Sequence, residues 1–164
     1  MSVKFYLGVA RSVITPEIGG HLMGYNNTTF STAINDDLTA SVFAFEQGNV
    51  RSMMITLTLC MVGNDIYDRM VTLLSEKFDI PKYNIIISAI HTHSAPMTKT
   101  HADWRVDIKY VDEILIPGII NAAELAVNSK ESVKVGVGQG ESLVAINRRQ
   151  LMPDNTVQLG QNPW

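Results

Sequence analysis

Apolar residues in the first half of the chain fall into short runs that predict β-strands. Residues 3–13 are rich in Val and aromatic side chains, residues 40–46 alternate apolar and polar positions, and residues 50–59 are rich in Met, Ile, Thr and Leu. Gln47-Gly48-Asn49 has the composition of a turn, so the second and third strands are expected to form a hairpin. Residues 84–90 form a nearly continuous apolar run, which is typical of a buried strand in a parallel or mixed sheet.

Two longer stretches repeat apolar residues at helical spacing. The first begins at Asn64 or Asp65, either of which can cap a helix, and runs through Lys77. Its apolar face consists of Ile66, Met70, Leu74 and Phe78. The second covers residues 107–128, where Pro117-Gly118 is expected to kink or split the helix because proline lacks an amide N–H.

The C-terminal third predicts further strands. These are residues 132–137, 143–147 and 156–159, and Pro153-Asp154-Asn155 has the chemistry of a turn between the last two. Strands that alternate with helices favour an α/β layer fold. We therefore expect a mixed, largely parallel sheet layered with two main helices, plus N-terminal hairpin strands. A length of 164 residues is usual for one domain, so a single α/β domain is expected over 1–164.

Composition excludes several classes of protein. With 46% hydrophobic and 18% charged residues the chain lacks the profile of a disordered protein, and its formal net charge of −3 argues against a nucleic-acid partner. Pro117-Gly118 interrupts the longest apolar run, 114–127, which argues against a transmembrane segment. Residues 1–8 do not resemble a secretory signal, so a cytoplasmic protein is expected. The one cysteine, Cys60, excludes an internal disulfide and is interpreted as a small buried apolar residue.

The strongest candidate for chemistry is His91-Thr92-His93, which follows the predicted strand 84–90 directly. Ligand sites in α/β sheets lie beyond the carboxyl ends of strands. If the extended backbone persists, both imidazoles point to the same side, where they can share a metal, or one can bind a metal while the other moves protons. The alternative is a pair of surface histidines at a strand end. His21 and His101 are interpreted as loop histidines.

A second candidate is the pair Arg148-Arg149 in a predicted strand. Neighbouring strand residues face opposite ways, so one guanidinium can enter a site while the other is solvated; a solvated pair is the alternative. The glycines of 136–140 are interpreted as a strand bend, because a phosphate-binding loop needs a helix after it.

Several stretches, in this order along the chain, together resemble the N-terminal part of the neutral/alkaline non-lysosomal ceramidase family. They are Gly8-Val9-Ala10-Arg11, Ile14-Thr15-Pro16, Met23-Gly24-Tyr25, Asp37-Leu38-Thr39-Ala40, Ile87-Ser88-Ala89-Ile90-His91-Thr92-His93-Ser94-Ala95-Pro96, Gly138-Gln139-Gly140, Asn147-Arg148-Arg149 and Gln161-Asn162-Pro163-Trp164. The stretch that contains both histidines is the most specific of them.

The resemblance implies a zinc-dependent amidohydrolase that cleaves an N-acyl amide such as ceramide. It implies that His91 is a zinc ligand, that His93 contacts substrate or relays a proton, and that Arg148 faces the same site. The family takes its other ligands (a second histidine, a glutamate and a tyrosine) from regions further along the chain. The sequence also lacks the family's aspartate near Cys60, at the end of the strand. A truncated, incomplete form that is inactive alone is therefore expected.

Two other functions remain open on the sequence. One is a non-catalytic α/β binding or assembly module, and the other is a hydrolase of a different amide or ester, because a fold does not fix a substrate. A lipid-like N-acyl substrate is the expected partner of a completed enzyme. A homo-oligomer is also expected, since an incomplete domain exposes sheet edges and apolar surface.

Overall fold

The computed structural model describes residues 4–24, 28–100, 104–142, 144–145 and 147–160. The chain divides into two compact units, Met1–Lys134 and Val135–Trp164. A single domain over 1–164 stays a prediction. No helix among the described residues is both long and apolar enough to cross a membrane.

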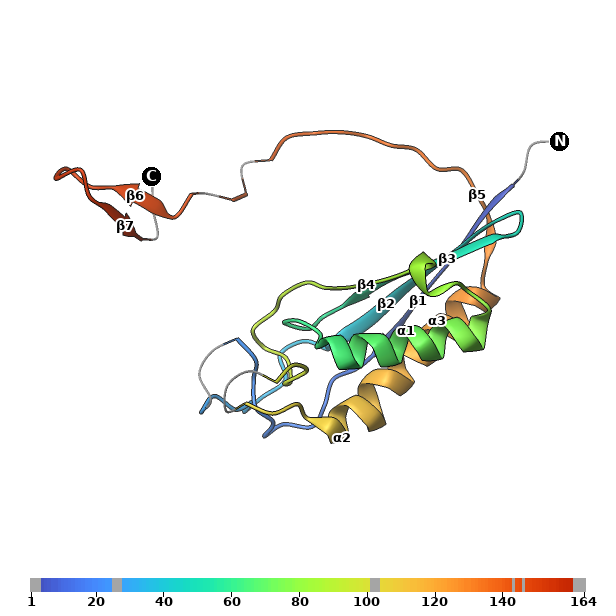
Figure 1. The fold of residues 1–164 in the computed structure, drawn as a ribbon, viewed down its shortest axis with the longest axis horizontal. Coiled ribbons are helices and arrows are strands. Elements are labelled where there is room, and N and C mark those ends of the chain that lie inside the picture. Colours follow the sequence, from blue (N-terminus) through green and yellow to red (C-terminus); the bar gives the residue numbers. More distant parts are fainter. Residues whose placement is uncertain (1–3, 25–27, 101–103, 143, 146, 161–164) are drawn as a thin grey trace. The chain divides into compact units, whose positions relative to one another are not determined.

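A five-stranded sheet forms the centre of the first unit, with strand order β4-β3-β2-β1-β5 (Figure 1). The strands are β1 (Phe5–Val13), β2 (Thr39–Gln47), β3 (Val50–Leu57), β4 (Ile85–Ala89) and β5 (Glu131–Val133). The predicted hairpin of β2 and β3 is confirmed, and its turn has Gly48 at a φ of 58°.

The expected mixed α/β fold with two main helices is confirmed, but less of the sheet is parallel than predicted. Among the described strands only β3 and β4 pair in parallel, while β2 pairs antiparallel with β3, and β1 pairs antiparallel with β2 and with β5. The difference follows from the connections. The tight turn between β2 and β3 forces antiparallel pairing, whereas the helix α1 (Asn64–Phe78) provides the long crossover that a parallel pair needs.

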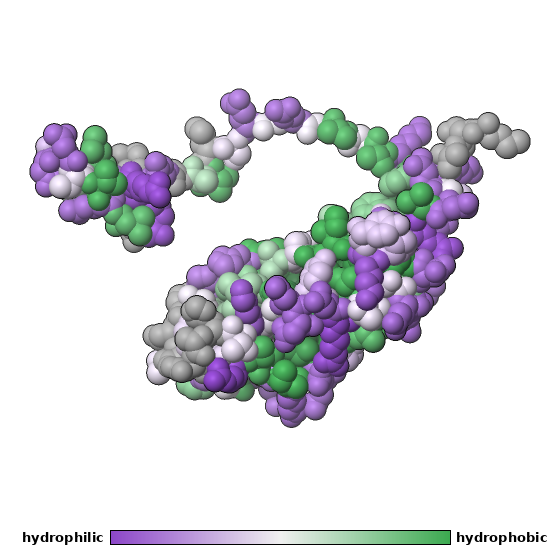
Figure 2. Space-filling model, in the orientation of Figure 1, coloured by the Kyte–Doolittle hydropathy of each residue, from purple (hydrophilic) through white to green (hydrophobic). Residues whose placement is uncertain are grey.

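The core lies between the sheet and two helices, α1 and α3 (Ile116–Asn128), which Figure 1 shows on the same side of the sheet. Alternate strand residues face these helices and are fully buried, among them Ala40, Val42, Ile55 and Leu57. Close packing requires Gly8 in β1, because a Cβ there would lie 1.7 Å from the Ala126 carbonyl oxygen of α3. In Figure 2 polar side chains dominate the outward side of the two helices.

The helical stretch predicted for 107–128 is present, but Pro117 does not split it. A short helix α2 (Ile108–Tyr110) leads into a π-helical turn, η2 (Val111–Leu115), and then into α3. Pro117 falls in the first turn of α3, just after the π-helical turn. A π-helical turn changes the hydrogen-bond spacing locally, which accommodates the missing amide N–H without ending the helix.

The described part of the second unit contains an antiparallel hairpin of β6 (Arg149–Leu151) and β7 (Val157–Leu159). The turn predicted between its strands is confirmed. There the Asp154 carboxylate accepts hydrogen bonds from the Thr156 N–H and hydroxyl, which lowers the pKa of Asp154.

Two predicted strands near the unit boundary are misplaced. The strand predicted over 143–147 is wrong for its described residues, because the side-chain oxygen of Asn147 instead accepts from the Arg149 N–H in a local turn and the strand begins at Arg149. The strand predicted over 132–137 is β5, which ends at Val133 where its pairing with β1 ends.

Candidate functional site

The histidine segment forms a turn that is fixed to the end of β3. Strand β4 ends at Ala89, and the next amides continue toward β3: Ile90 N–H donates to Leu57 O at 3.1 Å, and His91 N–H donates to Leu59 O at 3.0 Å. His91 has a φ of 66°, in the left-handed region that residues with a Cβ seldom occupy. Strained backbone of this kind concentrates at functional sites.

The two imidazoles meet at this turn, although the extended backbone does not persist through His91. Their Nε2 atoms lie 3.4 Å apart. Their ring centroids are 5.1 Å apart, with planes inclined at 73°. His91 is exposed and His93 is half-buried, so solvent reaches the pair. The same-side placement expected from strand periodicity is thus produced by a turn.

A backbone contact fixes the protonation pattern of His91. Its Nδ1 lies 2.7 Å from the carbonyl oxygen of Cys60. A carbonyl oxygen can only accept, so Nδ1 carries the hydrogen, and in the neutral imidazole Nε2 keeps a lone pair on the side of His93. Metal-binding histidines are held in this way, with one ring N–H donated to an oxygen and the other nitrogen presented to the ion.

Cys60 lies beside the two histidines and is buried. Its Sγ is 3.7 Å from His91 Nδ1. Each of the three residues offers one ligand atom, and these atoms all lie within 4.8 Å of one another. One cysteine and two histidines can therefore form a metal site here. Burial raises the pKa of the Cys60 thiol, which favours its neutral form in the metal-free protein.

The loop that contains Gly24 packs against His93. Met23 N–H donates to Ala95 O at 2.9 Å, and Leu22 forms an isolated bridge with Pro96. Gly24 has a φ of 109°, and a Cβ there would lie 2.4 Å from Cγ of His93. Gly24 belongs to one of the stretches that resemble the ceramidase family, but the sequence pattern does not indicate its contact with His93. Glycine is needed here for its left-handed backbone and for the close approach of the ring.

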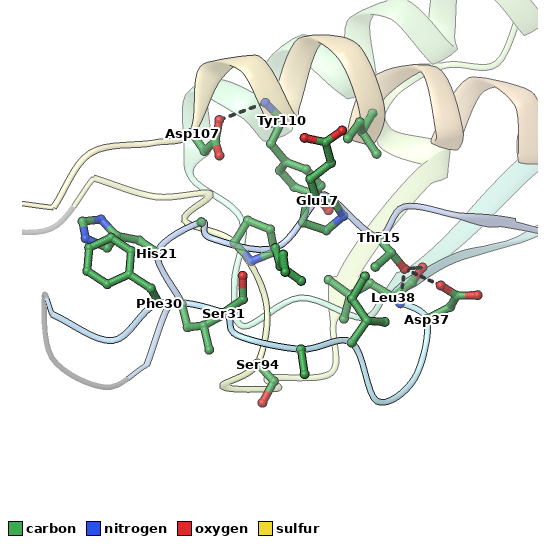
Figure 3. A pocket seen from close by; sticks show the side chains of 18 of the residues that line it. Thr15, Glu17, His21, Phe30, Ser31, Asp37, Leu38, Ser94, Asp107 and Tyr110 are labelled. Carbon is green, nitrogen blue, oxygen red and sulfur yellow. Dashed lines mark hydrogen bonds between the residues drawn. The ribbon is translucent and has the colours of Figure 1, made fainter.

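The other side of the histidine turn borders a pocket of about 740 Å³. Thr92 and Ser94, which alternate with the histidines, line this pocket. In Figure 3 His21 and Phe30 stand at one end, and their rings are 4.1 Å apart between centroids. His21 was interpreted from the sequence as a loop histidine, and no local pattern indicated that it lines a pocket.

Tyr110 also lines the pocket and is the buried polar group that sequence analysis missed. Its hydroxyl is buried and has no hydrogen-bond partner among the described residues. Burial and, to a smaller extent, the Asp107 carboxylate raise the pKa of Tyr110 well above its usual value. The phenol therefore stays neutral and keeps a hydrogen that it can donate.

Arg148 is the remaining predicted site residue. Arg148 belongs to the second unit, where its Nε donates to Gly160 O at 3.3 Å, and its role near His91 stays a prediction. His101 lies outside the described residues. The glycines of 136–140 are in neither a helix nor a strand.

Comparison with solved structures shows which known proteins have a similar fold. No family model matches the chain. The neutral ceramidase from Pseudomonas aeruginosa matches with a TM-score of 0.70 and 20% identity, over 80% of this chain and 23% of that one. A ceramidase complexed with C2 matches with a TM-score of 0.71 and 20% identity, over 80% of this chain and 22% of that one.

The fold of this chain is ceramidase-like. The resemblance found in the sequence is therefore supported at the level of fold. The chain spans less than a quarter of the length of these ceramidases.

Proposed function

We propose that this chain carries the histidine turn of a ceramidase-like, zinc-dependent amidohydrolase that acts on an N-acyl amide. The observation that carries the proposal is the contact between His91 Nδ1 and the Cys60 carbonyl oxygen, 2.7 Å, which leaves His91 Nε2 as a preorganised metal ligand. The ceramidase-like fold adds support, because the turn follows a strand at the edge where α/β enzymes place their sites.

The residues present fit a zinc ion. Zinc prefers imidazole and thiolate ligands, and the turn brings two imidazoles and a thiol together. Bound there, zinc would polarise an amide carbonyl and lower the pKa of a bound water to about 7. His91 is the proposed first ligand.

His93 is proposed to contact the substrate or to move a proton. Its Nε2 lies 3.4 Å from His91 Nε2, so a group bound at His91 is within its reach. An imidazole can accept a proton from an attacking water and donate one to a leaving amine. Gly24 supports this role because its loop holds the ring in place.

The pocket beside the turn is proposed to accept part of the substrate. Thr92 and Ser94 belong to the same turn as the histidines, so an amide near His91 lies close to the pocket wall. The lining combines apolar side chains such as Phe30 with polar ones such as Tyr110. Most small-molecule sites combine the two in this way.

Arg148 and the remaining ligands complete the proposal. A guanidinium suits a developing oxyanion because its charge and its donors are fixed, and this is the role proposed for Arg148. The resemblance implies a further histidine, a glutamate and a tyrosine from other regions. We therefore expect no amide hydrolysis from these 164 residues alone.

The experiment compares the chain with any longer reading frame of its gene. Each is assayed on a fluorescent N-acyl-sphingosine, with and without zinc. Zinc-dependent hydrolysis by the longer polypeptide, lost in His91→Ala, is the expected result. If the longer polypeptide binds zinc but cleaves no N-acyl amide, the substrate assignment is wrong.

An assembly role is the second candidate, and one surface favours it. On the face of the sheet away from α1 and α3, the register aligns Val9, Phe43, Met54 and Ile86 in one row across four strands. Ile86 is 60% exposed and Val9 is 52% exposed. A second copy of the chain could cover this row.

The oligomeric state tests the assembly role. Sedimentation analysis should give a dimer that Ile86→Lys dissociates. A monomer at all concentrations would contradict it.

A further inference from the structure

Cys60 lies where β3 meets the histidine turn. The residue before it, Leu59, accepts hydrogen bonds from the amides of His91, 3.0 Å, and Thr92, 3.3 Å. The Cys60 carbonyl oxygen accepts from His91 Nδ1 at 2.7 Å. Three hydrogen bonds thus connect Leu59 and Cys60 with the turn. They hold the backbone that carries the thiol at a fixed position beside the imidazoles.

The distance between the imidazoles fits a shared metal. A tetrahedral zinc with Zn–N of about 2.0–2.1 Å separates two nitrogens by about 3.4 Å. The two Nε2 atoms are 3.4 Å apart, and in the metal-free protein they form a long hydrogen bond.

The Cys60 sulfur is close enough to join the same ion. In a tetrahedral site a sulfur and a nitrogen ligand lie about 3.6 Å apart, because Zn–S is about 2.3 Å. Here Sγ lies 3.7 Å from His91 Nδ1, and one ligand atom from each of the three residues lies within 4.8 Å of the others. Rotation of the cysteine side chain is the movement that would bring Sγ to an ion bound at Nε2.

The surroundings of Cys60 suit a soft ligand. Met23, Cys60 and Met97 form a separate buried cluster, with Met61 and Trp104 packed against it. Methionine and cysteine are polarisable, and thiolates select zinc and other soft cations over magnesium or calcium. The cluster also shields one side of the thiol from water, while the exposed His91 leaves an entry path.

We propose that Cys60, His91 and His93 together bind a borderline-soft divalent cation such as zinc, with Cys60 as a thiolate ligand and the remaining positions open to other ligands. This rests on the proposed function for His91 and replaces the proton-transfer role proposed there for His93, because an Nε2 that binds the metal cannot also move a proton. When the cation binds, a sulfur–metal bond replaces the S–H bond, and the thiol proton passes to solvent. Neither the family resemblance nor the ceramidase-like fold assigns a role to Cys60.

Cobalt titration of the full chain tests the site, because tetrahedral cobalt with a thiolate ligand shows an intense near-ultraviolet charge-transfer band. The expected result is one cobalt per chain with this band, displaced by zinc. Cys60→Ser should abolish the band and weaken zinc binding by roughly 10–100-fold or more. His21→Ala is the matched control, because His21 lines the pocket and is not one of the three proposed ligands. It should change neither the cobalt band nor the zinc affinity.

The outcomes separate the two proposals. If cobalt binds through His91 without the charge-transfer band and Cys60→Ser binds zinc normally, the thiolate assignment is wrong and the proposed function stands. If neither cobalt nor zinc binds, both are wrong. If His93→Ala binds zinc as tightly as the unaltered chain, His93 is not a ligand.

A measurement on the unaltered chain covers the case in which Cys60→Ser fails to fold. Cys60 is the one cysteine, so a thiol reagent reports on it alone. Zinc should slow the reaction of this thiol by at least tenfold, and magnesium should leave it unchanged. Equal rates with and without bound zinc would overturn the proposal.

Discussion

The histidine turn has two sides that differ in chemistry. One side carries the ligand atoms of Cys60, His91 and His93. The other carries Thr92 and Ser94, which border the pocket and offer hydroxyl groups. Because the residues alternate, one short segment presents candidate metal ligands to one region and hydroxyl groups to the pocket. We therefore expect that metal binding and small-molecule binding can be altered separately here.

The largest difference between the two sides should appear on removal of a ligand. His91→Ala removes the imidazole whose Nδ1 is fixed by the Cys60 carbonyl oxygen, and zinc affinity should fall by roughly 100-fold or more. Ser94→Ala, on the pocket side, should leave zinc affinity unchanged. Titration calorimetry measures both. Equal losses in the two variants would mean that the two sides do not act separately.

Gly24→Ala should disturb the metal side through the loop that holds His93. The new Cβ would lie 2.4 Å from the ring, and the φ of 109° adds backbone strain. The free energy of unfolding should fall by about 2–4 kcal/mol. Urea denaturation measures it, and zinc affinity should fall as well.

Gly19→Ala is the matched control for Gly24→Ala. Gly19 has a similar φ of 100°, but a Cβ there meets nothing within 4 Å. Gly19→Ala should lower the free energy of unfolding by about 1 kcal/mol, because it introduces only the backbone strain. If the two variants are equally stable, contact with His93 contributes nothing.

Tyr110→Phe should alter the pocket side alone. It removes a buried hydroxyl that has no partner among the described residues, so the free energy of unfolding should rise by about 1 kcal/mol. Zinc affinity should stay constant. Tyr83→Phe, at an exposed tyrosine, is the control and should be neutral. A destabilised Tyr110→Phe protein would show that the hydroxyl has a partner.

The smallest effect concerns pH and the Cys60 thiol. Burial raises its pKa in the folded, metal-free protein. Its neutral form therefore stabilises the fold below the unfolded pKa of about 8.5, and this stabilisation is lost as the pH rises through the folded pKa. Above pH 8.5 the midpoint temperature of thermal unfolding should therefore fall more steeply with pH in the unaltered protein than in Cys60→Ala. Parallel pH profiles of the two proteins would contradict this.

Local patterns predicted most of the first unit. Alternation and turn chemistry located β2 and β3, and helical periodicity located α1 and the stretch 107–128. The extent of parallel pairing was overestimated, because the buried run 84–90 indicates a parallel strand without showing which strands lie beside it. The strand predicted over 143–147 is wrong for the described residues of that stretch, which pair with no strand.

The site was predicted only in part. The strand end and the spacing of His91 and His93 pointed to a shared site, and the two rings do meet. Cys60 is thirty-one residues before His91 in the sequence, so only the pairing of β3 with β4 shows that they are neighbours. The positions of Gly24 beside His93 and of Tyr110 in the pocket result from the packing of a loop and a helix, and no local sequence pattern predicts them.

Zinc content tests the central claim most directly. The purified chain is loaded with zinc, dialysed and analysed by inductively coupled plasma mass spectrometry, alongside His91→Ala. The account predicts about one zinc per chain in the unaltered protein and almost none in the variant. No zinc in the unaltered protein, or equal zinc in both, would contradict it.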